Sequence, residues 1–490
     1  MRATCNQIRC SDMTGQKIDI LFAIMAVQEV EFFIPVARRL MQEDGLNISF
    51  LTFHEAGDDI LEREGIPYFS LHKIKREKER NVRQASGDVE HIEKKLGVRV
   101  ENLIFHEMHM SGRNRKDLIS KATCYDSIFN DILRRNDIGC VVQELGGFIA
   151  PLTLYYASAE NRTDHIFIEP AMFRKRIVFT LNNLYADIPC YEDRKASMND
   201  DLRSLLDDYK DRKTVVIPKK DRHFFQDMTF RRLFSSDNFR RLSRKLYHKY
   251  ILGREEEYNW IFQYAAMHLI KAVRRKVLGI YYTNPVEGEK YVYYPFHVPL
   301  DVQLTARCPE FFGQEYLVTL IAKSLPPGYK LYIKEHPAAI GGHSLSKLKK
   351  ALALCDNIRL IQPGRNSYDI IRKAACVITV NSKVGFEAII QGKAVIVLGK
   401  TFYRGKGMTF DAGSSLSELP ETLKKAVNCG PVNQGERDSF LARAYDWSFK
   451  GELYENSPEN LADFYNSLKA FMLESGTIRG KEPCLEGTLR

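Results

Sequence analysis

Short apolar runs alternate with amphipathic stretches along the chain, most regularly between residues 330 and 411. Four such runs lie in that stretch, each followed by helical spacing: Leu331–Lys334, Ile358–Ile361, Cys376–Val380 and Val395–Gly399. This alternation is typical of parallel β-α-β units. The chain also opens with two apolar runs, Ile18–Ile24 and Ile48–Phe53, on either side of a helical pattern from about Glu29 to Gln42. We therefore predict an α/β protein with doubly wound units in both halves.

The pattern continues through the first half and then breaks before residue 291. A helix is predicted over Asp117–Arg135, and buried strands over Gly139–Gln143 and His165–Ile168. The segment NPVEGEK at 284–290 is rich in turn residues and precedes an aromatic strand, Tyr291–His297. We divide the chain into an N-terminal domain (1–285), a C-terminal domain (286–430) and C-terminal helices with a tail (431–490).

Composition narrows the class of protein. The chain has 490 residues, 44% of them hydrophobic, which suffices for several packed domains. No apolar run is long enough for a transmembrane helix, and the first residues lack an apolar signal core, so we expect a cytoplasmic protein. The ten cysteines form no C-x-x-C pair, which argues against a zinc site. The first strand-to-helix turn lacks the glycines of a dinucleotide-binding fingerprint, so no such cofactor is expected.

The net charge of +10 suggests a polyanionic partner. Residues 211–250 carry many Arg/Lys pairs with aromatic and leucine residues between them at helical spacing. Such a segment could lie against anionic lipid at the inner face of the cell membrane. Alternatively, its apolar stripe packs inward while the basic side chains stay solvated, and we favour this second interpretation. Nucleic acid is disfavoured because no nucleic-acid-binding motif occurs.

Two predicted strands of the N-terminal half end in a glutamate. Glu144 precedes Gly146 and Gly147, and Glu169 precedes a proline. In an open parallel sheet, ligands bind outside the carboxyl ends of the strands, so either side chain could serve a reaction there. Either could instead cap the following helix, a common role for a carboxylate. The pair His106 and His109 lacks a third nearby ligand, so we expect no metal there.

Polar side chains also follow the strands of the C-terminal half. His336 is fixed by Pro337 and can donate a hydrogen bond to a phosphate oxygen, and Lys334 adds positive charge. Ser367 stands where a helix is predicted to start. The amino ends of helices carry free N–H groups and partial positive charge, so these residues indicate an anion site.

A second helix is predicted to start just after Asn381 and Ser382. Gly385 would let a ligand approach the backbone closely. Glu387, about one turn into the helix, could accept hydrogen bonds from both ribose hydroxyls. Each residue alone is a weak signal, since serine at a helix start is usually only a cap. Their succession, each group after its own strand, is more specific.

The stretch KEHP…SYDIIRKAACVITVNSKVGFEAIIQGKAVIVLG resembles the capsular polysaccharide biosynthesis family, which includes bacterial Kdo (3-deoxy-manno-octulosonic acid) transferases. The segment YYPFHVPLDVQ at Tyr293–Gln303 is similar to the opening of the second domain in those proteins. The resemblance covers roughly Tyr291–Asp411. Where the family usually has Ser-Thr after the asparagine, this chain has Ser382-Lys383.

The resemblance implies a GT-B fold, in which two Rossmann-like domains face each other across a cleft. It places the nucleotide sugar, for which CMP-Kdo is the candidate, on the C-terminal domain and a glycan or glycolipid acceptor on the N-terminal one. By the same resemblance, His336 and Ser382 would hold the donor phosphate and Glu387 the nucleoside. No Asp-x-Asp sequence occurs, so no ligands for a metal-clamped donor are visible, and neither a metal nor another cofactor is expected.

Transfer also requires a carboxylate from the N-terminal side, as a base in an inverting reaction or a nucleophile in a retaining one. We rank Glu144 first, Glu169 second and Glu31 third. The sequence thus predicts a glycosyltransferase of surface polysaccharide synthesis. Two alternatives stay open: a non-hydrolysing sugar-nucleotide 2-epimerase, and a non-catalytic factor of capsule assembly or export.

Overall fold

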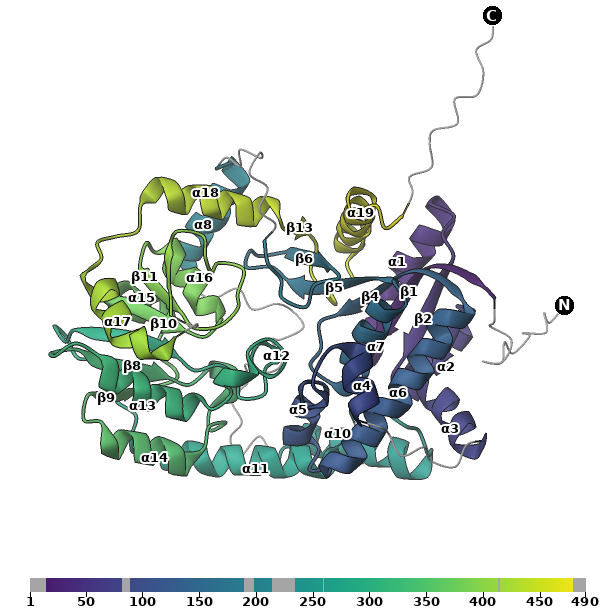
Figure 1. Ribbon diagram of the computed structural model, residues 1–490, viewed down its shortest axis with the longest axis horizontal. Helices are drawn as coiled ribbons and strands as arrows, with labels where there is room; N and C mark the ends of the chain where they lie inside the picture. The colour runs from purple at the N-terminus through teal and green to yellow at the C-terminus, as the bar shows by residue number, and fades with distance from the viewer. Residues whose placement is uncertain are drawn as a thin grey trace, which may run out of the picture.

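Two β-sheets, each covered by helices on both faces, make up the computed structural model (Figure 1). It describes residues 15–81, 89–188, 198–213, 234–258, 260–412 and 415–478, without the side chains of 80, 81, 91 and 92. This architecture confirms the predicted α/β class, with a Rossmann-like domain on each side of the molecule.

The N-terminal sheet has seven strands in the order β13-β6-β5-β4-β1-β2-β3. Their bounds are β1 Lys17–Ile24, β2 Ile48–Thr52, β3 Tyr68–Ser70, β4 Asp137–Glu144, β5 Asp164–Pro170, β6 Arg176–Leu181 and β13 Phe449–Lys450. The central strand β1 pairs in parallel with both β2 and β4, whereas β6 is antiparallel to its two neighbours. All the strands predicted in this half are present.

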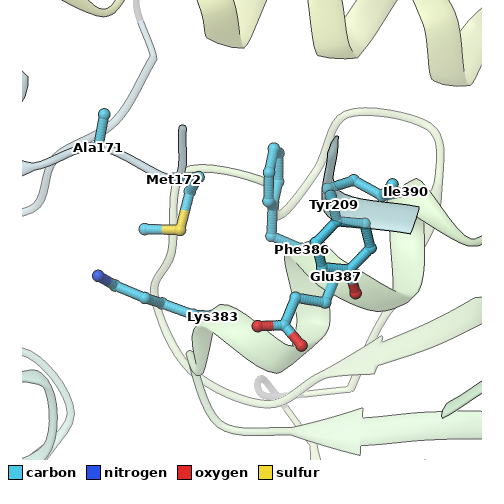
Figure 2. Close-up of a pocket in the computed structure, with 7 residues that line it drawn as sticks. All are labelled: Ala171, Met172, Tyr209, Lys383, Phe386, Glu387 and Ile390. Atoms are coloured by element: carbon cyan, nitrogen blue, oxygen red, sulfur yellow. The ribbon is translucent and has the colours of Figure 1, made fainter. Parts of the chain in front are cut away.

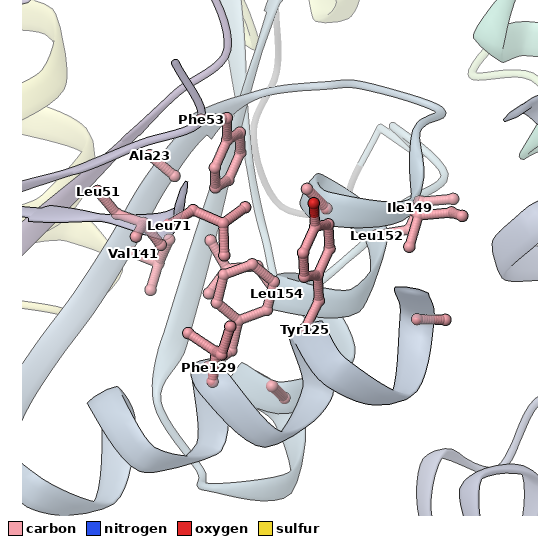
Figure 3. Packing of buried hydrophobic residues seen from close by; sticks show 14 of the residues in the cluster. Ala23, Leu51, Phe53, Leu71, Tyr125, Phe129, Val141, Ile149, Leu152 and Leu154 are labelled. Carbon is pink, nitrogen blue, oxygen red and sulfur yellow. The ribbon is translucent and has the colours of Figure 1, made fainter. Parts of the chain in front are cut away.

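Alternate residues of β1 enter two different cores, as the pleat of a strand requires. Leu21 and Ala23 pack with the core in Figure 3, where Phe53, Tyr125 and Phe129 also lie. Phe22 belongs to the core on the opposite face. The helices of this domain are α1 Val27–Glu43, α2 Glu55–Glu64, α3 Leu71–Asn81, α4 Val89–Leu96, α5 Val100–Met110, α6 Arg115–Arg135 and α7 Ile149–Glu160. Helix α8 (Asp200–Arg212) comes next in the sequence but lies against the C-terminal domain, where Leu202 and Leu206 share a core with Phe386 (Figure 1).

The C-terminal sheet has six parallel strands in the order β12-β11-β10-β7-β8-β9. Their bounds are β7 Tyr291–Pro295, β8 Lys330–Lys334, β9 Ile358–Ile361, β10 Cys376–Thr379, β11 Ala394–Val397 and β12 Thr409–Asp411. The helices are α12 Val302–Thr305, η4 Pro309–Phe311, α13 Gln314–Ser324, η5 Pro337–Ala339, α14 Leu345–Leu354, α15 Ser367–Lys373, α16 Lys383–Ile390, η6 Leu416–Glu418, α17 Leu419–Asn428 and α18 Gln434–Asp446. The apolar runs that alternate with helical stretches in the sequence therefore correspond to the strands and helices of this domain.

After α18 the chain returns to the N-terminal domain. The short strand β13 pairs with β6, and helix α19 (Pro458–Glu474) packs against α1. The ring of Phe464 lies 4.9 Å from that of Phe32, edge to face. The last described helix thus completes the core of the first domain, a connection that the sequence analysis did not predict.

Three helical segments between the two domains form one edge of the molecule (Figure 1): α10 Ser236–Leu246, η3 Tyr247–Ile251 and α11 Ile261–Leu278. The preference for an inward-packed apolar stripe in residues 211–250 is wrong for the described part, because α10 and η3 bury none of their residues. Residues 214–233 of that segment lie outside the described residues. Across the described ranges, no helix is both long and apolar enough to span a bilayer.

Candidate functional site

The C-terminal sheet reverses its winding direction between β7 and β10, and the predicted donor residues gather at this point. Such a switch point leaves a crevice at the carboxyl ends of the strands. His297 follows β7, and its Nε2 accepts a hydrogen bond from the backbone N–H of Asn381, which follows β10 (3.5 Å). The Asn381 side chain donates to the carbonyl of Gln303 (2.8 Å). The residues after these two strands are therefore direct neighbours.

Lys334 links the ends of β8 and β9. Its Nζ donates to Ser367 Oγ (2.7 Å) and to the Arg365 carbonyl (2.6 Å), and the side chain is buried. Burial lowers the pKa of Lys334 to about 8, an effect that the nearby Glu387 charge partly offsets. Ser367 is a partner of this lysine, whereas Asn366 caps α15. The lysine is a buried cation at the strand edge.

His336 follows β8 and precedes the 3-10 turn η5, which starts at Pro337. Its Nδ1 accepts a hydrogen bond from the Ala338 N–H (3.2 Å), which leaves the ring proton on Nε2 in the neutral form. Burial lowers the pKa of His336 to about 4, so the ring is neutral near pH 7. A neutral imidazole in this tautomer carries its proton on Nε2, and its role toward a phosphate stays a prediction.

Ser382 caps helix α16, because its side chain accepts a hydrogen bond from the Val384 N–H (3.2 Å). Tyr403 donates to the Ser382 carbonyl (2.6 Å). A Cβ on Gly385 would lie only 2.7 Å from Cζ of Tyr403. The glycine is therefore required by the tyrosine ring that packs on it, and the approach of a ligand is not needed to explain it.

Glu387 faces a small pocket at the boundary between the domains (Figure 2). Met172 and Tyr209, from the N-terminal half, lie opposite Lys383 and Phe386 of α16. The pocket has a volume of about 20 Å³, the room for roughly one water molecule. Burial raises the pKa of Glu387 to about 8, although Lys334 and Lys383 oppose this. A ribose could reach this carboxyl only if Tyr209 or Met172 moved.

The N-terminal sheet has its own switch point, between β1 and β4. Glu144 ends β4, and Glu29 lies in the first turn of the helix that follows β1. Both are buried. Tyr454 brings them together: its hydroxyl hydrogen-bonds to Glu144 and lies 3.1 Å from Oε1 of Glu29. Glu29 Oε2 also accepts from the Met25 N–H (2.7 Å).

Tyr454 is held in an unusual backbone conformation. Its φ is +65°, a left-handed value that costs a non-glycine residue about 1–3 kcal/mol. Burial, together with the charges of Glu144 and Glu29, raises the pKa of its hydroxyl, so the phenol stays protonated. The surrounding fold thus holds Tyr454 in a strained conformation. Its one hydroxyl proton lies between the two carboxylates.

The other two predicted carboxylates lie elsewhere. Glu169 forms a two-point ion pair with Arg307, one arm of which is Nη1 to Oε2 at 3.0 Å. Arg307 is buried and donates from Nε to the Leu184 carbonyl (2.8 Å), so this pair joins the two domains. Glu31 is exposed on α1, two residues past the buried Glu29. The structure brings neither residue to the Tyr454 cluster.

The carboxyl edges of the two sheets face each other across helix α12, which lies between the domains in Figure 1. His106 Nδ1 lies 2.9 Å from Thr305 Oγ1 of that helix. A Cβ on Gly147, just after β4, would approach both of these side chains at 3.1 Å. His106 is thus a contact between domains, and among the described residues no three His, Cys, Asp or Glu side chains gather as a metal site.

A family model described as "Capsule polysaccharide biosynthesis protein" matches residues 225–428. This part of the chain is similar to that family. The match confirms the resemblance and includes every predicted donor residue of the capsule polysaccharide family domain. It also extends upstream of residue 291, over α10 and α11.

Curated relatives of the capsule polysaccharide family domain match over part of their length. Protein FixF of Sinorhizobium fredii is 32% identical over 196 residues, which are 39% of this chain and 45% of the relative. Capsule polysaccharide export protein KpsS of Escherichia coli is 27% identical over 175 residues, 34% of this chain and 44% of the relative. The chain thus spans less than half of either relative.

Among solved structures, the KpsC beta Kdo 2,7 transferase of Thermosulfurimonas dismutans is 16% identical, with a TM-score of 0.31, and the match covers 68% of this chain and 85% of that one. The MnaA–UDP structure of S. aureus is 14% identical, with a TM-score of 0.30, and the match covers 95% of this chain and 99% of that one. Scores this low carry no substrate or mechanism over to this protein.

Proposed function

We propose that this protein is a GT-B glycosyltransferase of surface polysaccharide synthesis. The observation that carries the proposal is the pair of opposed switch points. One presents helix N–H groups, a histidine and a buried lysine, which suit a phosphate. The other presents two carboxylates that share a tyrosine. Donor binding and acceptor activation are the two tasks of a sugar transfer, and here each has a separate domain.

The donor half neutralises the leaving nucleotide. His336 would donate from Nε2 to a phosphate oxygen, and the amino end of α16 behind Ser382 would add partial positive charge. Lys334, the last residue of β8, would supply a full positive charge behind His336. A CMP-activated sugar such as CMP-Kdo suits this set because it carries a single phosphate. The resident groups suffice for that task, so we propose transfer without a metal ion.

The acceptor half would activate a hydroxyl of a glycan or glycolipid. Glu144 lies at the strand end nearest the cleft and is our proposed catalytic carboxylate, with Tyr454 and Glu29 as positioning residues. In an inverting reaction Glu144 accepts the proton of the acceptor hydroxyl as that oxygen attacks the anomeric carbon. We place this reaction in the cytoplasm, where nucleotide sugars are made.

The test is to incubate the full chain with a panel of radiolabelled nucleotide sugars, CMP-Kdo among them, and glycan or glycolipid acceptors. We expect transfer and nucleotide release in the presence of EDTA. An absence of binding and transfer with every donor would overturn the enzyme proposal. Conversion of a UDP-sugar to its epimer without acceptor would instead identify a 2-epimerase, and loss of transfer in EDTA would overturn metal independence.

A non-catalytic role in capsule assembly or export is distinguished in cells. Glu144→Gln and His336→Ala variants are expressed in place of the native protein, and capsule is measured. A transferase loses capsule production with either variant, whereas an assembly factor keeps it.

A further inference from the structure

Helix α10 and the π-helical turn η3 continue each other from Ser236 to Ile251 and bury no residue of their own. Four large apolar side chains on this run are highly exposed: Phe239 (72%), Tyr247 (52%), Tyr250 (58%) and Ile251 (70%). A soluble protein seldom presents so many large apolar side chains on one short helix without a partner for them.

An apolar stripe runs along α10. At 100° per residue, Phe239, Leu242 and Leu246 fall within one narrow face of that helix, and the exposed Tyr247, Tyr250 and Ile251 follow on the π-helical turn. Three arginines and a lysine occupy the remaining face, and all four are exposed: Arg240, Arg241, Arg244 and Lys245. The result is a basic amphipathic helix on the outside of the molecule.

Helix α11 packs against α10 along the same edge of the molecule (Figure 1) and has exposed apolar side chains of its own. Phe262 is 66% exposed, and Leu269, Ile270 and Val273 are each 47% exposed. Their spacing of seven, eight and eleven residues from Phe262 again defines one helix face. Lys276 near its carboxyl end is also exposed.

We propose that α10, η3 and α11 form a docking surface for a bilayer that contains anionic lipid. The apolar stripe would enter the headgroup region while arginine and lysine side chains contact lipid phosphates, the arrangement of an interfacial helix. A second copy of the chain would bring like charges together, and a nucleic acid would leave the apolar stripe in water. The surface is separate from both switch points, so the proposal does not depend on the catalytic one.

The experiment uses the full chain and sedimentation with vesicles of phosphatidylcholine, with and without 30% phosphatidylglycerol. We expect binding to the anionic vesicles that weakens as NaCl rises, and little binding to the neutral ones. The triple variant Arg240→Gln, Arg241→Gln, Arg244→Gln should bind about 100-fold more weakly, since each basic residue contributes about tenfold or less. Phe239→Ser with Ile251→Ser should weaken binding at least about tenfold.

The matched control is Lys424→Gln, Lys425→Gln, Arg443→Gln, which removes the same charge from exposed positions on α17 and α18. It should retain most of the binding. Equal binding to both vesicle types, no binding, or equal losses in the control and the α10 triple variant would each overturn the proposal. So would a dimer, detected by light scattering, that Phe239→Ser with Ile251→Ser dissociates, because the stripe would then be an interface between copies.

Discussion

In both domains the first strand lies inside the sheet and two later strands extend the sheet to one side of it. On the other side there are four strands in the N-terminal domain and three in the C-terminal domain. The two switch points are therefore equivalent in the backbone, but their side chains are of opposite character. Glu29 and Glu144 share the Tyr454 hydroxyl in the N-terminal domain, whereas Lys334, His336 and Ser382 stand at the ends of neighbouring strands or just after them in the C-terminal one. In the function that we propose, the same frame would serve proton transfer on one side and anion binding on the other, and the difference lies in the few residues after each strand.

The two sites also differ in how they are completed. All the predicted donor residues lie between Lys334 and Glu387, on consecutive β-α units. The carboxylate pair is closed by Tyr454, which arrives from the far end of the chain. Changes to these residues should separate the two halves of the proposed reaction.

The largest effect should come from Glu144→Gln. Loss of a general base or nucleophile is expected to reduce the transfer rate about 10² to 10⁴-fold, while nucleotide binding is unchanged. Glu31→Gln, on the exposed side of α1, is the matched control and should leave the rate alone. Equal rates for Glu144→Gln and the native protein would exclude Glu144 from the chemistry.

His336→Ala should affect donor binding, the task that we propose for the C-terminal domain. Removal of a hydrogen bond to a charged phosphate should weaken donor binding about 10 to 100-fold, measured by calorimetry. Lys330→Ala serves as the control, because Lys330 begins β8 whereas His336 follows its end. This variant should bind the donor normally. A loss of rate without a loss of donor affinity would place His336 outside the donor site.

Gly385→Ala tests the packing at the start of α16. The new methyl group would meet the Tyr403 ring, so we expect a loss of about 1–3 kcal/mol in the free energy of unfolding, measured in urea. Gly364→Ala is the control, because nothing lies within 4 Å of a Cβ there. Equal stability of the two variants would mean that the Tyr403 ring can move away from the new methyl group without loss of stability.

Glu387 should give the smallest effect, visible through pH. Its pKa is about 8 in the folded protein, well above the ordinary glutamate value, because it is buried. The stability that it contributes in the protonated form is complete below pH about 4.5 and is lost as pH rises through about 8. Between pH 6 and 7, the free energy of unfolding of Glu387→Gln should therefore rise by about 1 kcal/mol relative to that of the native protein. Glu421→Gln, at an exposed position, should show no such trend.

Much of the sheet framework could be predicted because buried parallel strands are short continuous apolar runs. Predicted Ile358–Ile361 coincides with β9, and Ile18–Ile24 differs from β1 by one residue. The donor residues followed from the same rule, since strand ends in one sheet share an edge. Local periodicity was enough to predict a strand, and the polar residues that directly follow a strand in sequence could be predicted with it.

What escaped prediction depends on contacts between distant residues. Strand β13 has two residues, too few for a pattern, and exists because β6 offers it a partner. The rotation of α1 decides that Glu29 is buried and Glu31 exposed, and both fit an amphipathic helix. The ion pair of Glu169 with Arg307 spans 138 positions. No local signal marked Tyr454, Arg307 or His297 for these roles.

Helix α19 has a consequence for how the protein is made. Phe464, Leu468 and Met472 fill the core between α1 and the first sheet, so that core has a gap until α19 has left the ribosome. The C-terminal domain, whose strands all lie between residues 291 and 411, can close earlier. The domain translated first is therefore the one that finishes folding last, and Tyr454 reaches Glu144 only at that final step.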